Sequence, residues 1–364
     1  MKTHSNSLTA LALRKFKKNT TGVLSFWFIV ICGCIAVFAY AFAPDNSANA
    51  NQMHLEIHSK KPGFSVTMLN IPSKQKENQT YLNKLLFGKK ITNVEIPISS
   101  YTIIGNTIQY IPYSELSDKT LLKTVEIHNF NKNDIQKFIS TKTFYFGTDK
   151  YGRDLLSRML IGTRISFFIG FIAVFISLVI GISIGAVAGY YGSKIDTFIM
   201  WLINITWSIP TLLLVIAITL ALGKGFWQVF IAVGLTMWVE VARVVRGQVM
   251  STKQMQYVEA AKALGFSNFR IIFKHILPNI MAPVIVISAA NFAAAILIES
   301  GLSFLGIGAQ PPTPSWGAMI KDHYSYIILG KAYLAVIPGL AIMSLVMAFM
   351  LVGNALRDAL DVKN

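Results

Sequence analysis

The stretch YVEAAKALGFSNFRIIFKHILPN, from Tyr257 to Asn279, decides how the rest of this chain is interpreted. Its spacing is helical, its charge is basic, and it is only partly apolar. It lies between two apolar runs, near residues 226–245 and 281–299, that can cross a lipid bilayer as helices. A charged helical segment between two such runs predicts a membrane protein with a folded internal loop.

Two short helices joined by a tight turn are predicted within this stretch. Gly265 ends the first helix, because glycine readily adopts the left-handed conformation found there. Ser267 can cap the second helix, and Pro278 ends it. We expect a hairpin whose second half lies against the membrane helices and whose first half projects away from them. Apolar residues share one side of the first helix at Tyr257, Ala260, Ala261 and Leu264, and of the second at Phe269, Ile272, Phe273 and Ile276.

The composition supports a polytopic membrane protein. Of 364 residues, 53% are hydrophobic and 14% charged, and the mean hydropathy is +0.52, which is too apolar for a soluble domain of this length. The net charge of +16 suits loops beside anionic lipid, and no base-reading motif accompanies it, so no nucleic acid is expected as a partner. Cys32 and Cys34 point in different directions on a helix, which excludes a disulfide between them.

Six runs are long enough to span a bilayer, so the predicted fold class is an all-α polytopic membrane protein with six transmembrane helices. The first resembles a signal peptide, but it is too long and Pro44 follows the small residue, so an uncleaved anchor is expected. The runs lie near 23–43, 165–188, 197–221, 226–245, 281–299 and 333–355.

Basic residues set the expected orientation of these spans. They precede the first span within the tail 1–22 and follow the fourth span, and both segments therefore belong on the cytoplasmic side. Six spans place both termini in the cytoplasm. The lysine-rich segment 44–143 is then external, since a region of that length translocates largely regardless of its charge.

Segment 44–143 is polar and contains β-like runs at 63–71 and 94–105 and a helix-like run at 133–140. A small α+β insertion is expected, with an extended, partly disordered loop as the alternative. Its HLEIH run places His54, Glu56 and His58 on one side of a strand, where a metal could bind. Three such residues without a fourth ligand are more typical of a solvated strand face, so no metal site is predicted.

Several polar or small residues within the spans are candidates for packing or transport. Gly181, Gly185 and Gly189 share one helix face and predict close helix packing, although a substrate pore along that face is an alternative. Asn291 and Glu299 are candidates for the pathway or gating, because polar groups at membrane depth are usually functional. Glu299 is expected near the outer interface, either hydrated or capping the next turn.

Other residues near the span ends are assigned structural roles. Glu240 is placed near the cytoplasmic end of the fourth span, where an ion pair with Arg243 one turn later is expected. Tryptophans near span ends typically anchor the membrane interface. The tryptophans in such positions are Trp207, Trp238 and Trp316.

The motif EAAKALG at 259–265, followed by ILPN at 276–279, resembles the EAA loop of ABC importer permeases. Three further stretches resemble the dipeptide, oligopeptide and nickel branch, and specifically its second permease subunit type. They are FGTDKYGRDLLSRMLIGTRIS (146–166), VARVVRGQVMS (241–251) and ESGLSFLGIGAQPPTPSWGAMI (299–320). The resemblance covers 144–364 and the first span but not the insertion. FYFGTD departs from the family's usual His-Pro-Phe-Gly-Thr-Asp, which affects only the turn before Gly147.

The resemblance implies a type I importer core at 144–364, with five spans and an EAA loop at 246–280, in the bacterial cytoplasmic (inner) membrane. The EAA loop would dock on a cytoplasmic ATPase, with Glu259 offering a carboxylate to the partner. The residues implied in this coupling are Glu259, Ala260, Ala261, Leu264 and Gly265. The implied partners are a sister permease, two ATPase subunits, an external substrate-binding protein and the lipid bilayer.

The chain itself carries no nucleotide-binding or catalytic motif. It lacks GxxxxGK[ST], HExxH and paired carboxylates, so it is expected to be non-catalytic and to hold no cofactor, with ATP and magnesium bound by the ATPase subunits. The expected function is import of di- or oligopeptides by alternating access, with nickel complexes or other small solutes as further candidates. A secondary transporter or channel is the alternative, but no charged residue is expected in the middle of a span and no pair of broken helices is expected. A membrane-embedded enzyme and an exporter permease are weaker alternatives.

Overall fold

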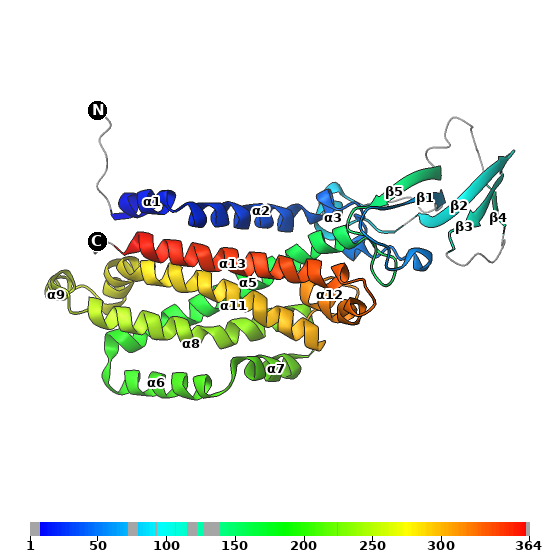
Figure 1. The fold of residues 1–364 in the computed structure, drawn as a ribbon. Coiled ribbons are helices and arrows are strands. Elements are labelled where there is room, and N and C mark those ends of the chain that lie inside the picture. Colours follow the sequence, from blue (N-terminus) through cyan, green and yellow to red (C-terminus); the bar gives the residue numbers. More distant parts are fainter. Residues whose placement is uncertain are drawn as a thin grey trace, which may run out of the picture. The chain divides into compact units, whose positions relative to one another are not determined.

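The computed structural model describes residues 8–71, 79–91, 93–105, 107–114, 122–126, 138–223 and 225–361. The chain forms two compact units. The first, which we call the helical unit, comprises Met1–Gly33, Ser166–Gln310 and Gly339–Asn364, and the second, the sheet unit, comprises Cys34–Ile165 and Pro311–Pro338. Figure 1 shows the helices and strands of both.

Long helices account for most of the described chain, as the apolar runs predict. The boundary between the units falls within α2, α5 and α13. The long helices are α2 (Thr20–Phe42), α5 (Leu155–Tyr191), α6 (Ser193–Ser208), α7 (Thr211–Leu222), α8 (Phe226–Thr252), α11 (Met281–Leu305) and α13 (Tyr333–Leu360). The shorter ones outside the central loop are α1 (Leu8–Lys18), α3 (Tyr81–Phe87), α12 (Trp316–His323) and the 3-10 turns η1 (Ala48–Ala50), η2 (Leu55–Ile57) and η6 (Tyr324–Ile327).

Among the described residues, five helices are long and apolar enough to cross a membrane, and a sixth span arises if α6 and α7 count together. The third predicted span at 197–221 is divided between two helices at Pro210. The axes of α6 and α7 meet at 92°, because Ile209 is extended and Pro210 provides no backbone N–H to continue the helix. The structure therefore contains a sharp break at Pro210, where the sequence allowed a kink in the third span.

Four other helices extend past their apolar runs. Helix α5 begins ten residues before the predicted position, and α8, α11 and α13 continue beyond 245, 299 and 355. In α8 the extension is polar and paired, since Arg246 donates to both carboxylate oxygens of Asp196 at the start of α6. Hydropathy marks only the part of a helix that is apolar, so these ends were missed.

Helices α5 and α8 approach each other closely along one stripe. A Cβ atom at Gly181 would lie 2.5 Å from the Cβ of Val241, and one at Gly185 would lie 2.5 Å from the backbone oxygen of Ala242. At Gly189 the nearest atom would be a backbone oxygen of α8 at 2.7 Å. All three glycines therefore face α8 within the helical unit, where no space is left for a side chain or a pore.

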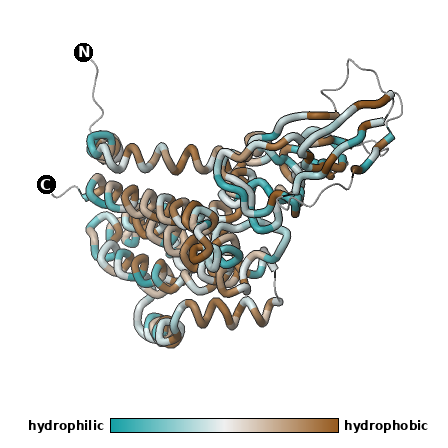
Figure 2. Tube along the Cα trace, turned by 45° about the vertical axis from the view of Figure 1, so that its right-hand side comes forward, coloured by the Kyte–Doolittle hydropathy of each residue, from teal (hydrophilic) through white to brown (hydrophobic). Residues whose placement is uncertain are grey.

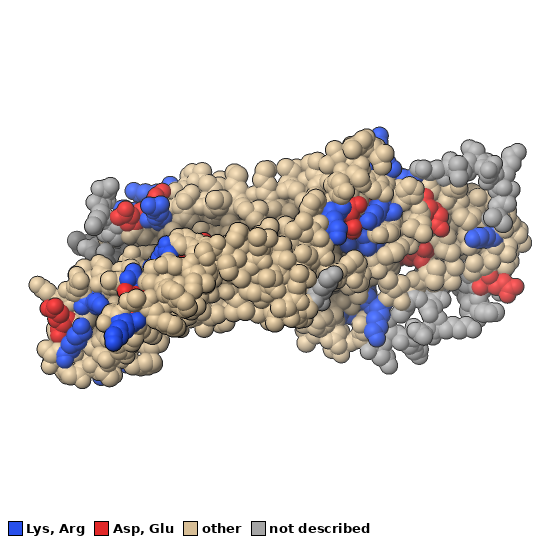
Figure 3. Space-filling model, turned by 90° about the horizontal axis from the view of Figure 1, so that it is seen from below, with Lys and Arg blue, Asp and Glu red and all other residues tan. Residues whose placement is uncertain are grey.

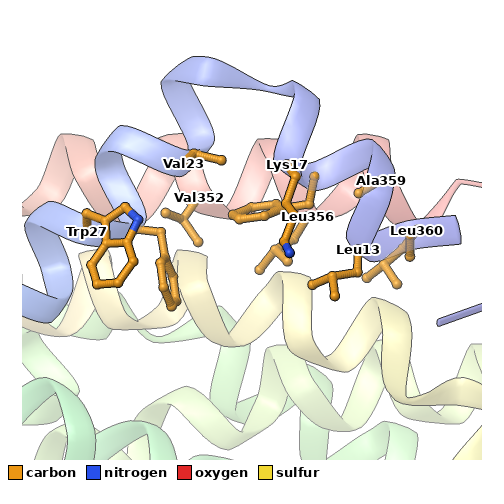
Figure 4. A pocket seen from close by; sticks show the side chains of 11 residues that line it. Leu13, Lys17, Val23, Trp27, Val352, Leu356, Ala359 and Leu360 are labelled. Carbon is orange, nitrogen blue, oxygen red and sulfur yellow. The ribbon is translucent and has the colours of Figure 1, made fainter. Parts of the chain in front are cut away.

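Both ends of the described chain meet within the helical unit. Lys15 of α1 donates to the backbone oxygen of Asp361, just beyond α13. The two ends enclose an apolar groove of about 520 Å³ (Figure 4). It is lined by Ala12, Leu13, Phe16, Lys17, Val23, Phe26, Trp27, Val352, Leu356, Ala359 and Leu360.

The sheet unit contains a five-stranded antiparallel sheet in the order β4-β3-β2-β1-β5. Its strands are β1 (Phe64–Ile71), β2 (Val94–Ile104), β3 (Thr107–Pro112), β4 (Lys123–Glu126) and β5 (Ile139–Phe144). The two β-like runs of the sequence are strands, so the extended-loop alternative is wrong for this part. The predicted helix at 133–140 lies mainly outside the described residues, and Ile139 and Ser140 belong to β5. Figure 2 shows apolar and polar residues intermingled along these strands, whereas the helices of the helical unit are mostly apolar.

The HLEIH run does not form the solvated strand face that we expected. It forms the 3-10 turn η2, and His54 is buried while Glu56 and His58 are exposed. Burial, aided by the positive charge of Lys142, lowers the pKa of His54, although Glu95 at 3.8 Å opposes this shift. Among the described residues, no three His, Cys, Asp or Glu side chains are placed to hold a metal ion.

Candidate functional site

The central loop folds as a hairpin that we call the EAA hairpin, residues 256–280. Its first helix is α9 (Gln256–Ala263), and its second arm runs through α10 (Asn268–Arg270), the π-helical η4 (Ile271–Ile276) and η5 (Leu277–Ile280). Between them Gly265 has a φ of +73°. Its N–H donates to the oxygen of Lys262, and that of Phe266 donates to the oxygen of Ala261. These two bonds form a Schellman motif, which requires the left-handed conformation at Gly265.

The second arm begins as the sequence predicts. Ser267 is extended, and its side chain accepts from the backbone N–H of Arg270. The guanidinium of Arg270 lies 4.1 Å from the ring centroid of Phe266, which fixes the turn from the other side. The following six residues are π-helical, a local geometry often found at functional sites.

One side of the hairpin packs into the helical unit. Val258 and Ala261 of α9 and Ile271, Ile272 and Ile276 of η4 are buried. They form a single apolar cluster with α5, α8 and α11 through Ala186, Val241, Val245, Val249 and Val284. Tyr190 of α5 also donates to Asn268 at 2.8 Å. The hairpin is thus held to three long helices at once.

The other side of the hairpin exposes large apolar side chains. Leu264 is 73% exposed and Phe269 is 70% exposed. Phe273 is also exposed, and its ring centroid lies 4.3 Å from that of Phe269. Met255 and Tyr257, at the start of α9, are also exposed. Figure 3 shows charged side chains at the end of the helical unit where Figure 1 places α9.

The residues assigned to coupling do not all lie on this face. Glu259, Ala260, Leu264 and Gly265 are exposed, but Ala261 is buried in the chain's own apolar cluster. Ala261 is therefore not part of the exposed face, and its small size serves packing inside the chain. Similarly, the predicted apolar side of the second arm is divided. Ile272 and Ile276 face inward, while Phe269 and Phe273 face outward.

Asn291 and Glu299 both lie within α11, about 12 Å apart along the helix. Of the two expectations for Glu299, hydration is wrong, because Glu299 is 1% exposed and α11 continues to Leu305, while its contacts reach the following turn. Its carboxylate accepts from Ser303 at 2.7 Å, and Ser303 in turn accepts from the N–H of Ala309. Glu299 therefore supports the turn after α11. Asn291 is also buried, and its Nδ2 has no hydrogen-bond partner among the described residues.

The expected ion pair between Glu240 and Arg243 is absent from the described part of the chain. The Arg243 guanidinium instead stacks 3.5 Å from the ring centroid of Trp207 and donates to Asn204. Trp207 thus contacts a cation, and Trp238 and Trp316 are buried rather than interfacial anchors. Trp316 donates to the backbone oxygen of Met159.

Comparisons with known proteins place the EAA hairpin within a matched region. Residues 181–363 match the family described as binding-protein-dependent transport system inner membrane component. Residues 7–62 match the N-terminal transmembrane domain of oligopeptide transport permease C. Residues 63–180 fall outside both matches.

Named relatives are similar over about the same region. The dipeptide transport system permease of Alkalihalophilus pseudofirmus is 42% identical over 219 residues, which cover 60% of this chain and 72% of that protein. The glutathione transport system permease of Pectobacterium atrosepticum is 40% identical with the same shares, and the oligopeptide transport system permease of Bacillus subtilis is 39% identical, covering 61% and 73%. A chain of the methionine ABC transporter, solved in inward-facing conformations, aligns over 56% of this chain and 96% of its own at 19% identity, with a TM-score of 0.46.

Proposed function

This chain belongs to the family of binding-protein-dependent transport system inner membrane components, and from that membership we propose that it forms half of the pathway of an ATP-driven peptide importer. It is a multi-pass membrane permease of the ABC importer class. The relatives support this function and give no support to a secondary transporter or channel. The relatives carry this conclusion, since the fold does not separate the two classes. Secondary transporters also use broken helices such as α6–α7.

In the proposed topology, α6 and α7 together cross the membrane once, which gives six spans with both termini in the cytoplasm. The contact between α1 and the end of α13 supports an even number of crossings, since both ends then lie on one side. The basic residues before α2 and around the EAA hairpin support a cytoplasmic location for that side. The sheet between α2 and α5 is then external.

The observation that carries the proposed coupling is the two-sided character of the EAA hairpin. Leu264, Phe269 and Phe273 are exposed on one side, while the other side is buried against α5, α8 and α11. A short apolar face on a projecting helix suits a groove on a partner protein. A partner that moves this face displaces the hairpin together with the long helices to which it is packed.

The cycle proposed for the assembly is alternating access. Two ATPase subunits bind ATP and magnesium, and one of them receives the EAA hairpin of this chain while the other receives that of a sister permease. ATP favours the closed ATPase pair, and it shifts the permease between inward-open and outward-open states only because it binds one state more tightly. An external binding protein delivers the peptide to the outward-open state.

Leu264→Asp is expected to detach the ATPase subunits without unfolding this chain. Leu264 makes few contacts within the chain, but burying it in a partner groove would stabilise the complex by about 2 kcal/mol. The aspartate loses this contribution and must also be desolvated. We expect the amount of ATPase co-purifying with the tagged permease to fall about tenfold or more.

Leu264→Met is the matched control, because it keeps the volume and the apolar character of the side chain. It is expected to retain the ATPase subunits. Wild-type amounts of ATPase on the Leu264→Asp variant would show that this face is not the docking surface.

A further inference from the structure

Glu240 lies at membrane depth. Along the helix axis it lies about 21 Å from the start of α8 and about 18 Å from its end. A bilayer core takes up about 20 helical residues. Wherever that core falls along the 27 residues of α8, Glu240 remains about five residues or more inside either edge. The predicted span at 226–245 corresponds to the shallowest of these placements.

The carboxylate of Glu240 does not pair directly with a basic side chain in the described part of the chain. The nearest basic residue along α8, Arg243, is held elsewhere by Trp207 and Asn204. Arg243 therefore stacks on Trp207, which also lines the cavity described next, rather than hydrogen-bonding Glu240.

Glu240 lines a small cavity of about 140 Å³ at the break between α6 and α7. Thr206 and Trp207 contribute from the end of α6, Thr211 from the start of α7, and Thr236 from the preceding turn of α8. The hydroxyls of Thr206 and Thr236 donate to backbone oxygens of their own helices. Their oxygen lone pairs, like the carboxylate, accept hydrogen bonds, so the polar atoms of this cavity favour a donor or a cation.

Glu240 is exposed in the single chain. An unpaired carboxylate that faced lipid tails would be strongly destabilising, whereas one that faces a water-filled pathway is not. We infer that the cavity formed by Thr206, Thr211, Thr236 and Glu240 is a binding site on the translocation pathway for the ammonium group of a peptide. This inference rests on the proposed peptide importer and assigns one of its chemical contacts.

The test measures equilibrium binding to the nucleotide-free transporter, with its sister permease and ATPase subunits, in nanodiscs without the binding protein. The ligands are labelled dialanine and N-acetyl-dialanine, which lacks the ammonium group. Wild type is expected to bind dialanine about tenfold more tightly, as a charge-assisted hydrogen bond in a partly dry site allows. In Glu240→Gln the affinity for dialanine is expected to fall to that for N-acetyl-dialanine, which itself stays unchanged.

Glu240→Asp keeps the charge and is expected to retain part of the preference for dialanine. Ser251→Ala, exposed on the same helix outside the cavity, is expected to bind both ligands as wild type does. The inference is wrong if Glu240→Gln retains the preference, if it weakens both ligands equally, or if wild type shows no saturable binding at millimolar concentrations. A basic residue of the sister permease paired with Glu240 would produce the last of these results.

ATP-driven uptake of dialanine by wild-type proteoliposomes, measured in parallel with the binding protein present, separates the two claims. If uptake is driven by ATP but binding shows no preference for the ammonium group that depends on Glu240, this inference alone is wrong. A lack of ATP-driven peptide uptake overturns the proposed function itself.

Discussion

Gly265→Pro is expected to abolish ATP-driven uptake while leaving the membrane helices folded. Proline fixes φ near −65°, but Gly265 has a φ of +73°. Proline also removes the N–H that donates to the oxygen of Lys262. Both hydrogen bonds of the Schellman turn are then lost, and the exposed face of α9 can no longer keep its place beside Phe269 and Phe273. We expect uptake to fall about a hundredfold, equivalent to a loss of about 3 kcal/mol in coupling.

Gly265→Ala separates the two effects of proline, because alanine disfavours the left-handed backbone but keeps the backbone N–H. A Cβ atom at this position meets no other atom within 4 Å, so the cost is the left-handed backbone alone. That cost is about 1–2 kcal/mol, so Gly265→Ala is expected to retain a measurable part of the uptake. Equal uptake by wild type and Gly265→Pro would show that the turn does not transmit motion from the ATPase.

Gly185→Ala is expected to destabilise the helical unit through its contact with α8. The new Cβ would lie 2.5 Å from the backbone oxygen of Ala242 and 2.9 Å from the Cβ of Val245. Backbone atoms cannot move aside as a flexible side chain can, so the two helices must separate. Overpacking of this kind costs about 1–3 kcal/mol, which we expect to see as a lower midpoint of thermal aggregation for the purified chain in detergent.

Gly247→Ala is the matched control, since Gly247 lies in α8 and a Cβ there meets nothing within 4 Å. Alanine is the better helix former by about 1 kcal/mol, so this variant should be as stable as wild type or slightly more stable. If Gly185→Ala had the same thermal midpoint as Gly247→Ala, the close approach of α5 and α8 would not contribute to stability.

Hydropathy and periodicity predicted the membrane helices but not their ends or their breaks. The polar end of α8 stays helical because Arg246 pairs with Asp196, a residue 50 positions away that no local pattern reveals. Pro210 allows a kink by local chemistry, but the 92° bend depends on how α7 packs against α8. Two strands of the sheet were predicted from their composition, whereas their antiparallel order depends on contacts between distant residues.

The candidate site shows a similar limit. Gly265 and Ser267 mark the turn by local chemistry, and both have the predicted role. Helix α9, however, has two apolar stripes, one through Val258 and Ala261 and one through Tyr257 and Leu264. Periodicity alone cannot tell which stripe packs inward, because that depends on α5 and α8. The predicted ion pair between Glu240 and Arg243 failed in a similar way. Arg243 stacks on Trp207, which is distant in sequence, so no local pattern reveals this contact.

The most direct test of the proposed importer is the energy source of uptake by proteoliposomes. They would contain this permease, its sister permease and the ATPase subunits, with the loaded binding protein outside. Uptake of labelled dialanine is expected to require ATP in the lumen and the binding protein, and to be unchanged by ionophores that dissipate proton and sodium gradients. Uptake that persists without ATP and follows an imposed ion gradient would contradict the account and identify the chain as part of a secondary transporter.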